Sequence, residues 1–305
     1  MPTLSVALLL VPDFLLIVLG ALLRRRNAFD ASFWPGLERL VYFVLFPALL
    51  FRSLARSPLA LGDAGRMIAV AYAFTLAGML LSALGRPLLR LPQPTFAACF
   101  QCGFRFNTYV ALAAASRVGG DAGIALISLL IGTLVPLVNF AAVGMLARGR
   151  DQRVLSQLAR NPLIIACVAG FGWQLTGAPL PGVADHILGL LAAAAVPLGL
   201  LAVGAGLVLR RGTLPLPAIA WWSGVKLVAM PAVALLLAQL LGLAPLERQI
   251  AVIMAAAPTA TSAYILAMQM TGHGAPVAVL ISSGTLLAAL TLPLWIALVG
   301  SPVGP

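Results

Sequence analysis

Charged residues are scarce in this sequence, and acidic residues are the scarcest. Only 9% of the 305 residues are charged, with 8 Asp or Glu against 19 Lys or Arg, whereas soluble domains carry roughly 25% charged residues. This composition excludes a soluble globular fold. Since 62% of the residues are hydrophobic and the mean hydropathy is +1.06, the sequence predicts a polytopic membrane protein whose partner is the lipid bilayer.

Cysteine is also rare. Cys99, Cys102 and Cys167 all lie in apolar runs, so no disulfide framework is predicted. Cys99 and Cys102 form a C-x-x-C pair, but a redox motif requires a thioredoxin-like context, and the two histidines are badly placed to complete a zinc site. We interpret the cysteines as small packing residues and predict neither a metal nor a cofactor.

Catalytic motifs are missing as well. The sequence contains no H-E-x-x-H, no G-x-S-x-G and no Walker A motif, so it predicts neither an intramembrane hydrolase nor an ATPase. The net charge of +11 does not indicate nucleic acid, because the arginines cluster in short connections and do not alternate with aromatic residues. We therefore expect no enzyme activity and no nucleic-acid partner.

Ten apolar runs of about twenty residues follow one another along the chain. The first has no basic start and no clear cleavage site, so we interpret it as a retained span and not as a signal peptide. Arginines gather in the connections after spans one, three, five and seven, which places both termini outside by the positive-inside rule. The predicted spans are residues 5–23, 37–54, 67–85, 95–116, 122–146, 161–178, 185–209, 216–242, 249–270 and 275–299.

Two of the spans are interrupted. Span four contains Phe104-Arg105-Phe106-Asn107-Thr108-Tyr109, which is too polar to face lipid, and span nine contains Ala257-Pro258-Thr259-Ala260-Thr261-Ser262. Irregular backbone at membrane depth survives only where protein or a water-filled cavity satisfies its freed N–H and C=O groups. Two matched interruptions therefore predict a binding site near the middle of the bilayer.

The two halves of the chain match each other at an offset near 150 residues. Pro12 aligns with Pro162, and Pro47 aligns with Pro197. Each half holds five spans, and an odd number means that the second half enters the membrane from the opposite side. We predict a first five-helix repeat at residues 1–148, a cytoplasmic link at 149–160 and a second, inverted repeat at 161–305.

Four stretches resemble the auxin efflux carrier family and its bacterial members. They are FPALLF at 46–51, RNPLIIA at 160–166, VPLGLLAVGAG at 196–206 and APTATSAYILAM at 257–268. The resemblance covers the whole chain and implies an all-α fold of ten transmembrane helices in two inverted five-helix repeats, with helices four and nine broken and crossing at the midplane. It also implies a scaffold of spans one, two, six and seven beside a transport domain, homodimerisation through that scaffold, and a place in the inner membrane.

The same resemblance implies a secondary transporter that moves a small organic anion, a carboxylate such as malonate or malate, by alternating access. This sequence has no acidic residue in span three, so no proton relay is expected there. Two alternatives stay open. One is an anion channel, and the other is a sodium-coupled organic anion symporter of the bile-acid-carrier type, in which Thr261, Gln269 and backbone carbonyls at the breaks would hold Na⁺.

Candidate substrate-binding residues lie at the two breaks. Arg105 is the strongest, because an arginine inside a span costs roughly 2.5–3.5 kcal/mol and a fixed guanidinium suits bidentate contact with a carboxylate. The others cap the resumed helices, bind ligand, or do both, since free N–H groups at a helix start bind anions. They are Asn107, Thr108, Tyr109, Pro258, Thr259, Thr261 and Ser262, to which we add Pro47 and Pro197, the prolines that kink spans two and seven.

Asp13 and Lys226 are candidates for coupling transport to an ion. Asp13 is the only acidic residue that we assign to the interior of a span, and it lies near the outer end of span one, where a solvated or ion-paired state is expected. Lys226 lies inside span eight and is a candidate for a proton-coupled or substrate-facing charge. Arg52 is expected to anchor the end of span two, and Gly204 to let span seven approach a neighbouring helix closely.

Overall fold

The computed structural model describes residues 3–30, 32–57, 65–147, 161–207 and 214–300. Over these ranges the chain forms helices and no strands, which confirms the predicted all-α class. Five stretches are long and apolar enough to cross a membrane, and shorter apolar helices accompany them. The predicted cytoplasmic link at 149–160 lies outside the described residues.

Helices cover each of the ten predicted spans, with ends displaced by a few residues. The first five correspond to α1 (Thr3–Arg25), α2 with η1 and α3 (Phe33–Leu40, Val41–Leu45 and Phe46–Ala55), α4 (Gly65–Leu89), α5 with η2 (Gln93–Phe100 and Gln101–Gly103), and α6 (Thr108–Ala147). The second five correspond to α8 (Pro162–Leu175), α9 (Gly182–Ala205), α10 with η3 and α11 (Leu216–Gly224, Val225–Ala229 and Met230–Leu240), α12 and α13 (Pro245–Ala256 and Ser262–Thr271), and α14 (Gly274–Val299).

One helix, α6, holds both the end of span four and all of span five. The two parts meet at Gly120, whose backbone has φ 52° and ψ −137°. A positive φ of this kind is accessible to glycine at little cost, so the chain reverses there without a separate loop.

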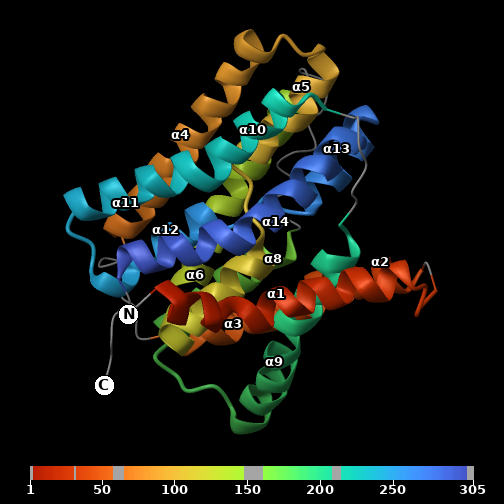
Figure 1. Cartoon of the computed structure of the whole chain (residues 1–305). Coiled ribbons are helices and arrows are strands. Elements are labelled where there is room, and N and C mark those ends of the chain that lie inside the picture. The colour runs from red at the N-terminus through yellow and green to blue at the C-terminus, as the bar shows by residue number, and fades with distance from the viewer. Residues whose placement is uncertain (1–2, 31, 58–64, 148–160, 208–213, 301–305) are drawn as a thin grey trace.

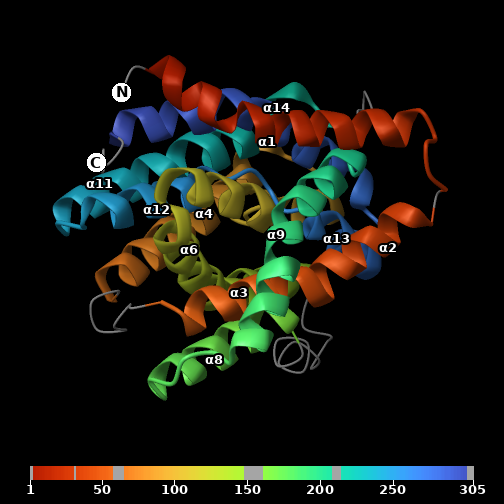
Figure 2. The same ribbon diagram turned by 90° about the horizontal axis from the view of Figure 1, so that it is seen from below.

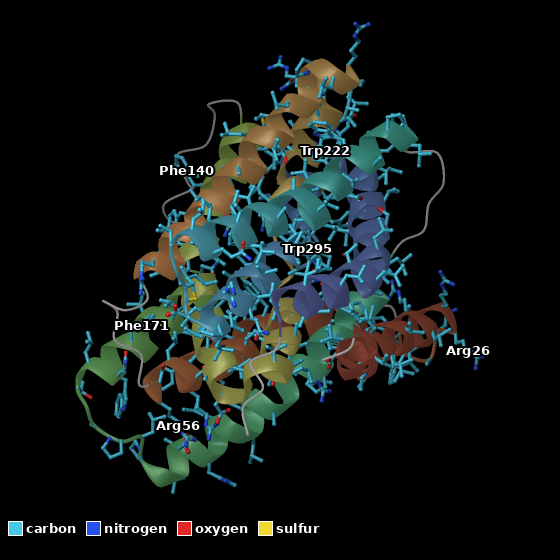
Figure 3. All side chains as sticks on the ribbon, turned by 60° about the vertical axis from the view of Figure 1, so that its left-hand side comes forward. Arg26, Arg56, Phe140, Phe171, Trp222 and Trp295 are labelled. Carbon is cyan, nitrogen blue, oxygen red and sulfur yellow. The ribbon has the colours of Figure 1, made fainter. Side chains whose placement is uncertain are left out.

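Two helices widen into a π turn directly before a proline, at η1 before Pro47 and at η3 before Pro231. Proline has no N–H and its ring clashes with the carbonyl four residues earlier, and the wider turn accommodates both effects. The carbonyl freed before Pro231 belongs to Leu227, and the indole N–H of Trp295 donates to it at 2.8 Å (Figure 3). Both proline kinks are therefore absorbed without breaking the helix.

The helices pack in two groups (Figures 1 and 2). In the first group, α1 lies along α9, and α3 packs against α8 and α9. In the second group, α12 packs against α4, α11 and α14, and α13 packs against α14. In Figure 1 the first group is seen below, at α1, α3 and α9, and the second above, at α4, α10 and α11. Helix α6 touches both groups, through α12 on one side and α3, α8 and α9 on the other.

The contact between α1 and α9 brings the two backbones together at two glycines. A Cβ atom on Gly204 would overlap the carbonyl oxygen of Ile17, and one on Gly20 would overlap the carbonyl oxygen of Leu201. Small residues at helix interfaces are the usual means of close packing where lipid provides no hydrophobic driving force. The close approach expected at Gly204 is confirmed.

The outer surface of the bundle is apolar. Large hydrophobic side chains such as Leu80, Val168, Leu290 and Leu298 are 67–70% exposed on helices from both groups. A soluble protein rarely leaves so much contiguous apolar surface open to water, whereas lipid solvates it without cost. The fold is that of a multi-pass membrane protein.

Candidate functional site

Span four is interrupted between α5 and α6. The last turn of α5 tightens into η2, residues 104–107 leave helical geometry, and α6 begins at Thr108. Asn107 caps the new helix, because its Oδ1 accepts the backbone N–H of Tyr109 at 3.0 Å and that of Val110 at 3.3 Å. Of the two residues expected to cap this helix, the structure uses Asn107.

Span nine is interrupted in the same way between α12 and α13. Helix α12 ends at Ala256, residues 257–261 are not helical, and α13 begins at Ser262. Pro258 explains the stop, because it has no N–H to offer the carbonyl of Met254. The backbone that resumes after it presents the first turn of α13 toward the first break.

Three hydrogen bonds join the two breaks, which therefore cross in contact. Each satisfies a backbone group, as irregular backbone in an apolar environment requires. The Asn107 N–H donates to the Pro258 carbonyl at 2.7 Å, the Thr259 hydroxyl donates to the Cys102 carbonyl at 2.7 Å, and the Gln101 amide donates to the Ala263 carbonyl at 3.2 Å.

Arg105 places a positive charge at this crossing. Its side chain is buried, and its guanidinium donates to the Ser262 hydroxyl at 2.9 Å and to the Gln101 side-chain oxygen at 3.3 Å. Both partners are neutral. Among the ion pairs formed by the described residues, none involves Arg105, so its charge is not neutralised by a neighbouring carboxylate.

A cavity of about 620 Å³ lies beside the crossing. Its volume falls in the range of roughly 300–1,000 Å³ that is usual for small-molecule sites. Helices α2, α6, α8 and α13 contribute to its walls, together with the two breaks. Six of the predicted site residues line it, namely Arg105, Asn107, Thr108, Tyr109, Thr261 and Ser262.

Comparison with known proteins agrees with this architecture. A family model described as "Membrane transport protein" matches residues 147–296. An uncharacterized transporter of Methanothermobacter thermautotrophicus (strain Delta H) is 27% identical over 298 residues, which cover 96% of this chain and 95% of the relative. Both matches agree with the resemblance to the auxin efflux carrier family. This chain is a membrane transport protein and not an enzyme.

The other predicted site residues of this transporter do not line the cavity. Pro258 and Thr259 hold the crossing together through their hydrogen bonds to the first break. Pro47 follows a π turn, and Pro197 lies inside α9. Lys226 is buried in η3 and donates to the Ala255 carbonyl at 2.7 Å, away from the cavity.

The predicted site left out five polar residues that line this cavity, Glu38, Arg39, Tyr42, Asn139 and Asn161. The expectation that Asp13 is the only acidic residue inside a span is wrong, because α2 begins at Phe33 and continues into the second span with Glu38 half-buried. Asn161 caps α8 by accepting the N–H of Leu163 at 3.0 Å. In the sequence, an asparagine directly before the proline that opens α8 predicts a helix cap. Nothing in the sequence predicts that Asn161 also lines the cavity.

Asp13 forms an ion pair that links the two helix groups of this transporter. Its carboxylate accepts Nε and Nη2 of Arg117 at 3.2 and 3.3 Å, which joins α1 to α6. Arg117 lies nine residues after Thr108, or about 13 Å farther along α6 at 1.5 Å per residue. The ion pair is therefore displaced from the cavity toward the turn at Gly120.

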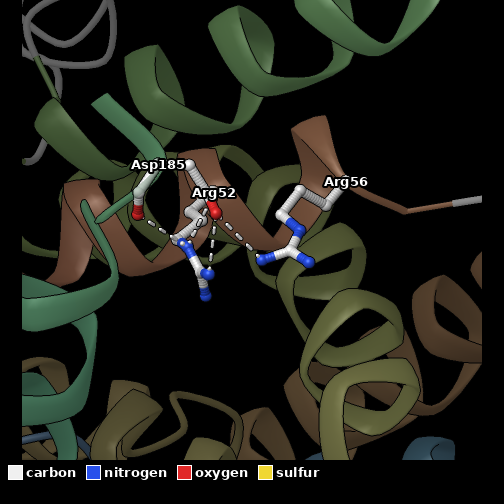
Figure 4. Close-up of polar contacts among 3 residues, drawn as sticks. All are labelled: Arg52, Arg56 and Asp185. Carbon is white, nitrogen blue, oxygen red and sulfur yellow. Dashed lines mark hydrogen bonds and ion pairs between the residues drawn. The ribbon is translucent and has the colours of Figure 1, made fainter. Parts of the chain in front are cut away.

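A second ion pair lies within the first group (Figure 4). Asp185, in the first turn of α9, accepts Nε of Arg52 at 2.8 Å and Nη1 of Arg56 at 3.2 Å. Both arginines come from α3. Arg52, expected as an anchor at the end of span two, thus also ties α3 to α9.

A second cavity, of about 440 Å³, lies between α3, α6 and α9, with Arg52, Ser116 and Asp121 among its lining residues. The same three helices carry an aromatic contact. Phe46 of α3 stacks on Tyr109 of α6 with ring centroids 4.6 Å apart, and Gly199 of α9 packs against both rings. Tyr109 also lines the first cavity.

Proposed function

We propose that this membrane transport protein is a secondary transporter that moves a small organic anion, a carboxylate such as malonate or malate, by alternating access. The observation that carries the proposal is the buried guanidinium of Arg105, which lines the cavity with neutral partners alone. A buried charge without a counter-ion is costly, and an anionic ligand would supply one. Its fork of N–H donors matches the two oxygens of a carboxylate.

Further donors at the cavity support an anion. The side-chain nitrogen of Asn107 is buried without a hydrogen-bond partner, while its oxygen is committed to the cap of α6. The first turns of α6 and α13 both border the cavity through Thr108, Thr261 and Ser262. The amino-terminal end of each helix carries a partial positive charge that favours an anion.

We propose that the ten spans form two inverted five-helix repeats, at residues 1–148 and 161–305, joined by a cytoplasmic link at 149–160. The paired interruptions of spans four and nine, which bond to each other, support this arrangement. In it the crossing lies at the midplane of the inner membrane, both termini lie outside, and two copies associate through the scaffold.

In the proposed cycle the first helix group is the scaffold and the second group is the transport domain. The packing supports this division, because α1, α3, α8 and α9 contact one another extensively while α12 and α14 anchor the other helices. Movement between the groups would separate Phe46 from Tyr109 and Asp13 from Arg117. The bound anion would then reach the second cavity while the first one closes.

The test is uptake of radiolabelled malonate and malate into liposomes that contain the purified protein. A carrier gives saturable uptake that trapped unlabelled substrate accelerates. Uptake without saturation or counterflow would identify a channel, and accumulation driven only by a sodium gradient would identify a sodium symporter. If a panel of dicarboxylates and monocarboxylates gives no uptake at all, the substrate class is wrong.

Arg105→Ala is the variant that tests the site. We expect it to weaken carboxylate affinity about 10- to 100-fold, because a hydrogen bond to a charged group contributes roughly 1.5–3 kcal/mol. Arg105→Lys should recover only part of the affinity, since lysine lacks the planar fork. Arg66→Ala is the matched control, because Arg66 is exposed and donates to the Leu241 carbonyl at 3.3 Å. Unchanged uptake by Arg105→Ala would remove Arg105 from the site.

A further inference from the structure

Lys226 lies on the far side of the crossing from Arg105. Its side chain is 2% exposed, and its ammonium group donates to the Ala255 carbonyl at 2.7 Å. The Met230 sulfur is its other neighbour, at 3.9 Å. The π turn η3 carries it, and π turns inside helices often mark functional positions.

The carbonyl that Lys226 binds is free because of the break. In an uninterrupted helix the Ala255 carbonyl would accept the N–H of residue 259, but residues 257–261 leave helical geometry. It thus belongs to the carboxyl end of α12, where the helix dipole concentrates negative charge. In transporters with broken helices, such carboxyl ends and unwound carbonyls are the groups that coordinate a coupling cation.

No acidic side chain accompanies Lys226. Among the described residues, neither an ion pair with Lys226 nor a group of three or more His, Cys, Asp or Glu suited to a metal is present. The adjoining cavity measures about 10 Å³, which is room for one water molecule at most. The Thr259 hydroxyl on its wall is already committed to the Cys102 carbonyl. The ammonium group therefore fills the only space beside the freed carbonyl that these residues leave.

We propose that Lys226 is a built-in cation, whose ammonium group takes the place of a bound metal ion at the carboxyl end of the broken helix α12. The protein's own side chain then supplies the charge that a symporter of this architecture would recruit from solution. Sodium is consequently not needed to complete the crossing. Lys226 is a positioning residue, because it holds the break in shape and does not line the cavity that contains Arg105.

The role of Lys226 at the break does not depend on the proposed transport function. Only the conclusion that transport needs no sodium rests on that function. The decisive measurement is therefore thermal stability of the purified protein, which requires no substrate. Wild-type protein is compared in sodium chloride, choline chloride and methylammonium chloride at equal ionic strength, and we expect one melting temperature in all three. Specific stabilisation of the wild-type protein by sodium would overturn the proposal.

Lys226→Ala removes the ammonium group and leaves space for a small cation. We expect a melting temperature lower by several degrees in choline, and recovery in sodium or methylammonium but not in the larger choline. Lys226→Met is the matched control, because it fills the space without a charge and should gain nothing from either cation. Equal melting temperatures of the alanine variant in all three salts would overturn the proposal. If Lys226→Ala cannot be purified, Lys226→Ser takes its place in the same comparison.

A transport arm separates the two proposals. If malonate or malate is carried, wild-type uptake should be the same with and without a sodium gradient, and methylammonium should raise the uptake of Lys226→Ala. Sodium-dependent wild-type uptake would overturn the built-in cation while leaving anion transport in place. Absence of any anion uptake would overturn the transport proposal, while the melting temperatures would still decide the role of Lys226.

Discussion

Single residues at the crossing serve structure and binding with different atoms. The oxygen of Asn107 caps α6, its backbone N–H bonds Pro258, and its side-chain nitrogen is buried without a partner. An unsatisfied buried donor costs free energy unless a ligand completes it. The same amide thus fixes the start of the helix and leaves a donor unsatisfied on a residue that lines the cavity.

Asn107→Asp separates these two uses. Aspartate caps a helix as well as asparagine does, so we expect the melting temperature to stay close to that of the wild-type protein. The carboxylate replaces the N–H donors with a negative charge beside the cavity, so anion uptake should fall at least about tenfold, which corresponds to roughly 1.4 kcal/mol.

Asn107→Ala supplies the comparison for the cap. It removes both the cap and the donor, and should cost about 1 kcal/mol of folding stability in addition to lowering uptake. Thermal unfolding and liposome uptake of the two variants together distinguish the roles. Wild-type uptake by Asn107→Asp would contradict a binding role for the amide.

At the residue scale, the sequence singles out residues that are costly in a membrane. Arg105 stands out because a buried arginine requires a reason, and the structure buries it beside the cavity. Thr259 was expected at the site, but its hydroxyl bonds the Cys102 carbonyl, 157 positions away, a tertiary contact that no local pattern encodes. Glu38 was missed because the position of a helix start is uncertain by several residues in a sequence without caps.

At the scale of helices, the most constrained contact is that between α1 and α9. Their backbones touch where Gly20 meets Leu201 and Gly204 meets Ile17, so neither glycine has room for a Cβ atom. The contact joins the first and seventh predicted spans. Their relative position is set by backbone shape, and no rotamer change can accommodate an added methyl group there.

Gly204→Ala should therefore destabilise the protein by about 1–3 kcal/mol or more, as overpacking does, and lower its melting temperature. The matched control is Gly172→Ala in α8, where no atom lies within 4 Å of the added Cβ. Alanine is the better helix former by about 1 kcal/mol, so the control should be neutral or slightly more stable. Equal melting temperatures for the two variants would contradict the close contact.

Helix existence was predictable from hydropathy, and helix geometry was not. Every predicted span contains a helix. About twenty apolar residues are needed to cross a bilayer, and a helix is one of the few structures that satisfies all their backbone N–H and C=O groups there. The π turns before Pro47 and Pro231 and the direct junction of two helices at Gly120 were not foreseen. Such geometry depends on which neighbouring group forms a hydrogen bond with the backbone group that the irregularity frees. The indole N–H of Trp295, for example, donates to the freed carbonyl of Leu227.

Over the whole molecule, two cavities border α6, and the stacked rings of Phe46 and Tyr109 join α3 to the same helix. The ion pair between Asp13 and Arg117 links α1 of the first group to α6. Breaking a well-buried ion pair costs several kcal/mol, although this one is partly exposed at Arg117. In the proposed cycle it must separate whenever the helix groups move apart.

A covalent bridge in place of that ion pair should stop transport. In the double variant Asp13→Cys with Arg117→Cys, a bifunctional methanethiosulfonate reagent that spans the length of the lost arginine side chain is expected to abolish anion uptake, and a reductant should restore it. Cys99, Cys102 and Cys167 are buried and free, so they do not compete for the reagent. Each single-cysteine variant, treated alike, is the control and should keep its uptake. Full uptake by the cross-linked protein would show that α1 and α6 do not move apart.

The hydrogen bonds across the two breaks also set an order for biosynthesis. The first break leaves the N–H of Asn107 and the carbonyl of Cys102 without partners until Pro258 and Thr259 have been made. A ribosome that has inserted the first half has therefore produced helices but not a finished membrane domain. The unpaired backbone groups of span four must therefore remain in the bilayer while about 150 further residues are synthesised. Folding is complete only when span nine has been inserted.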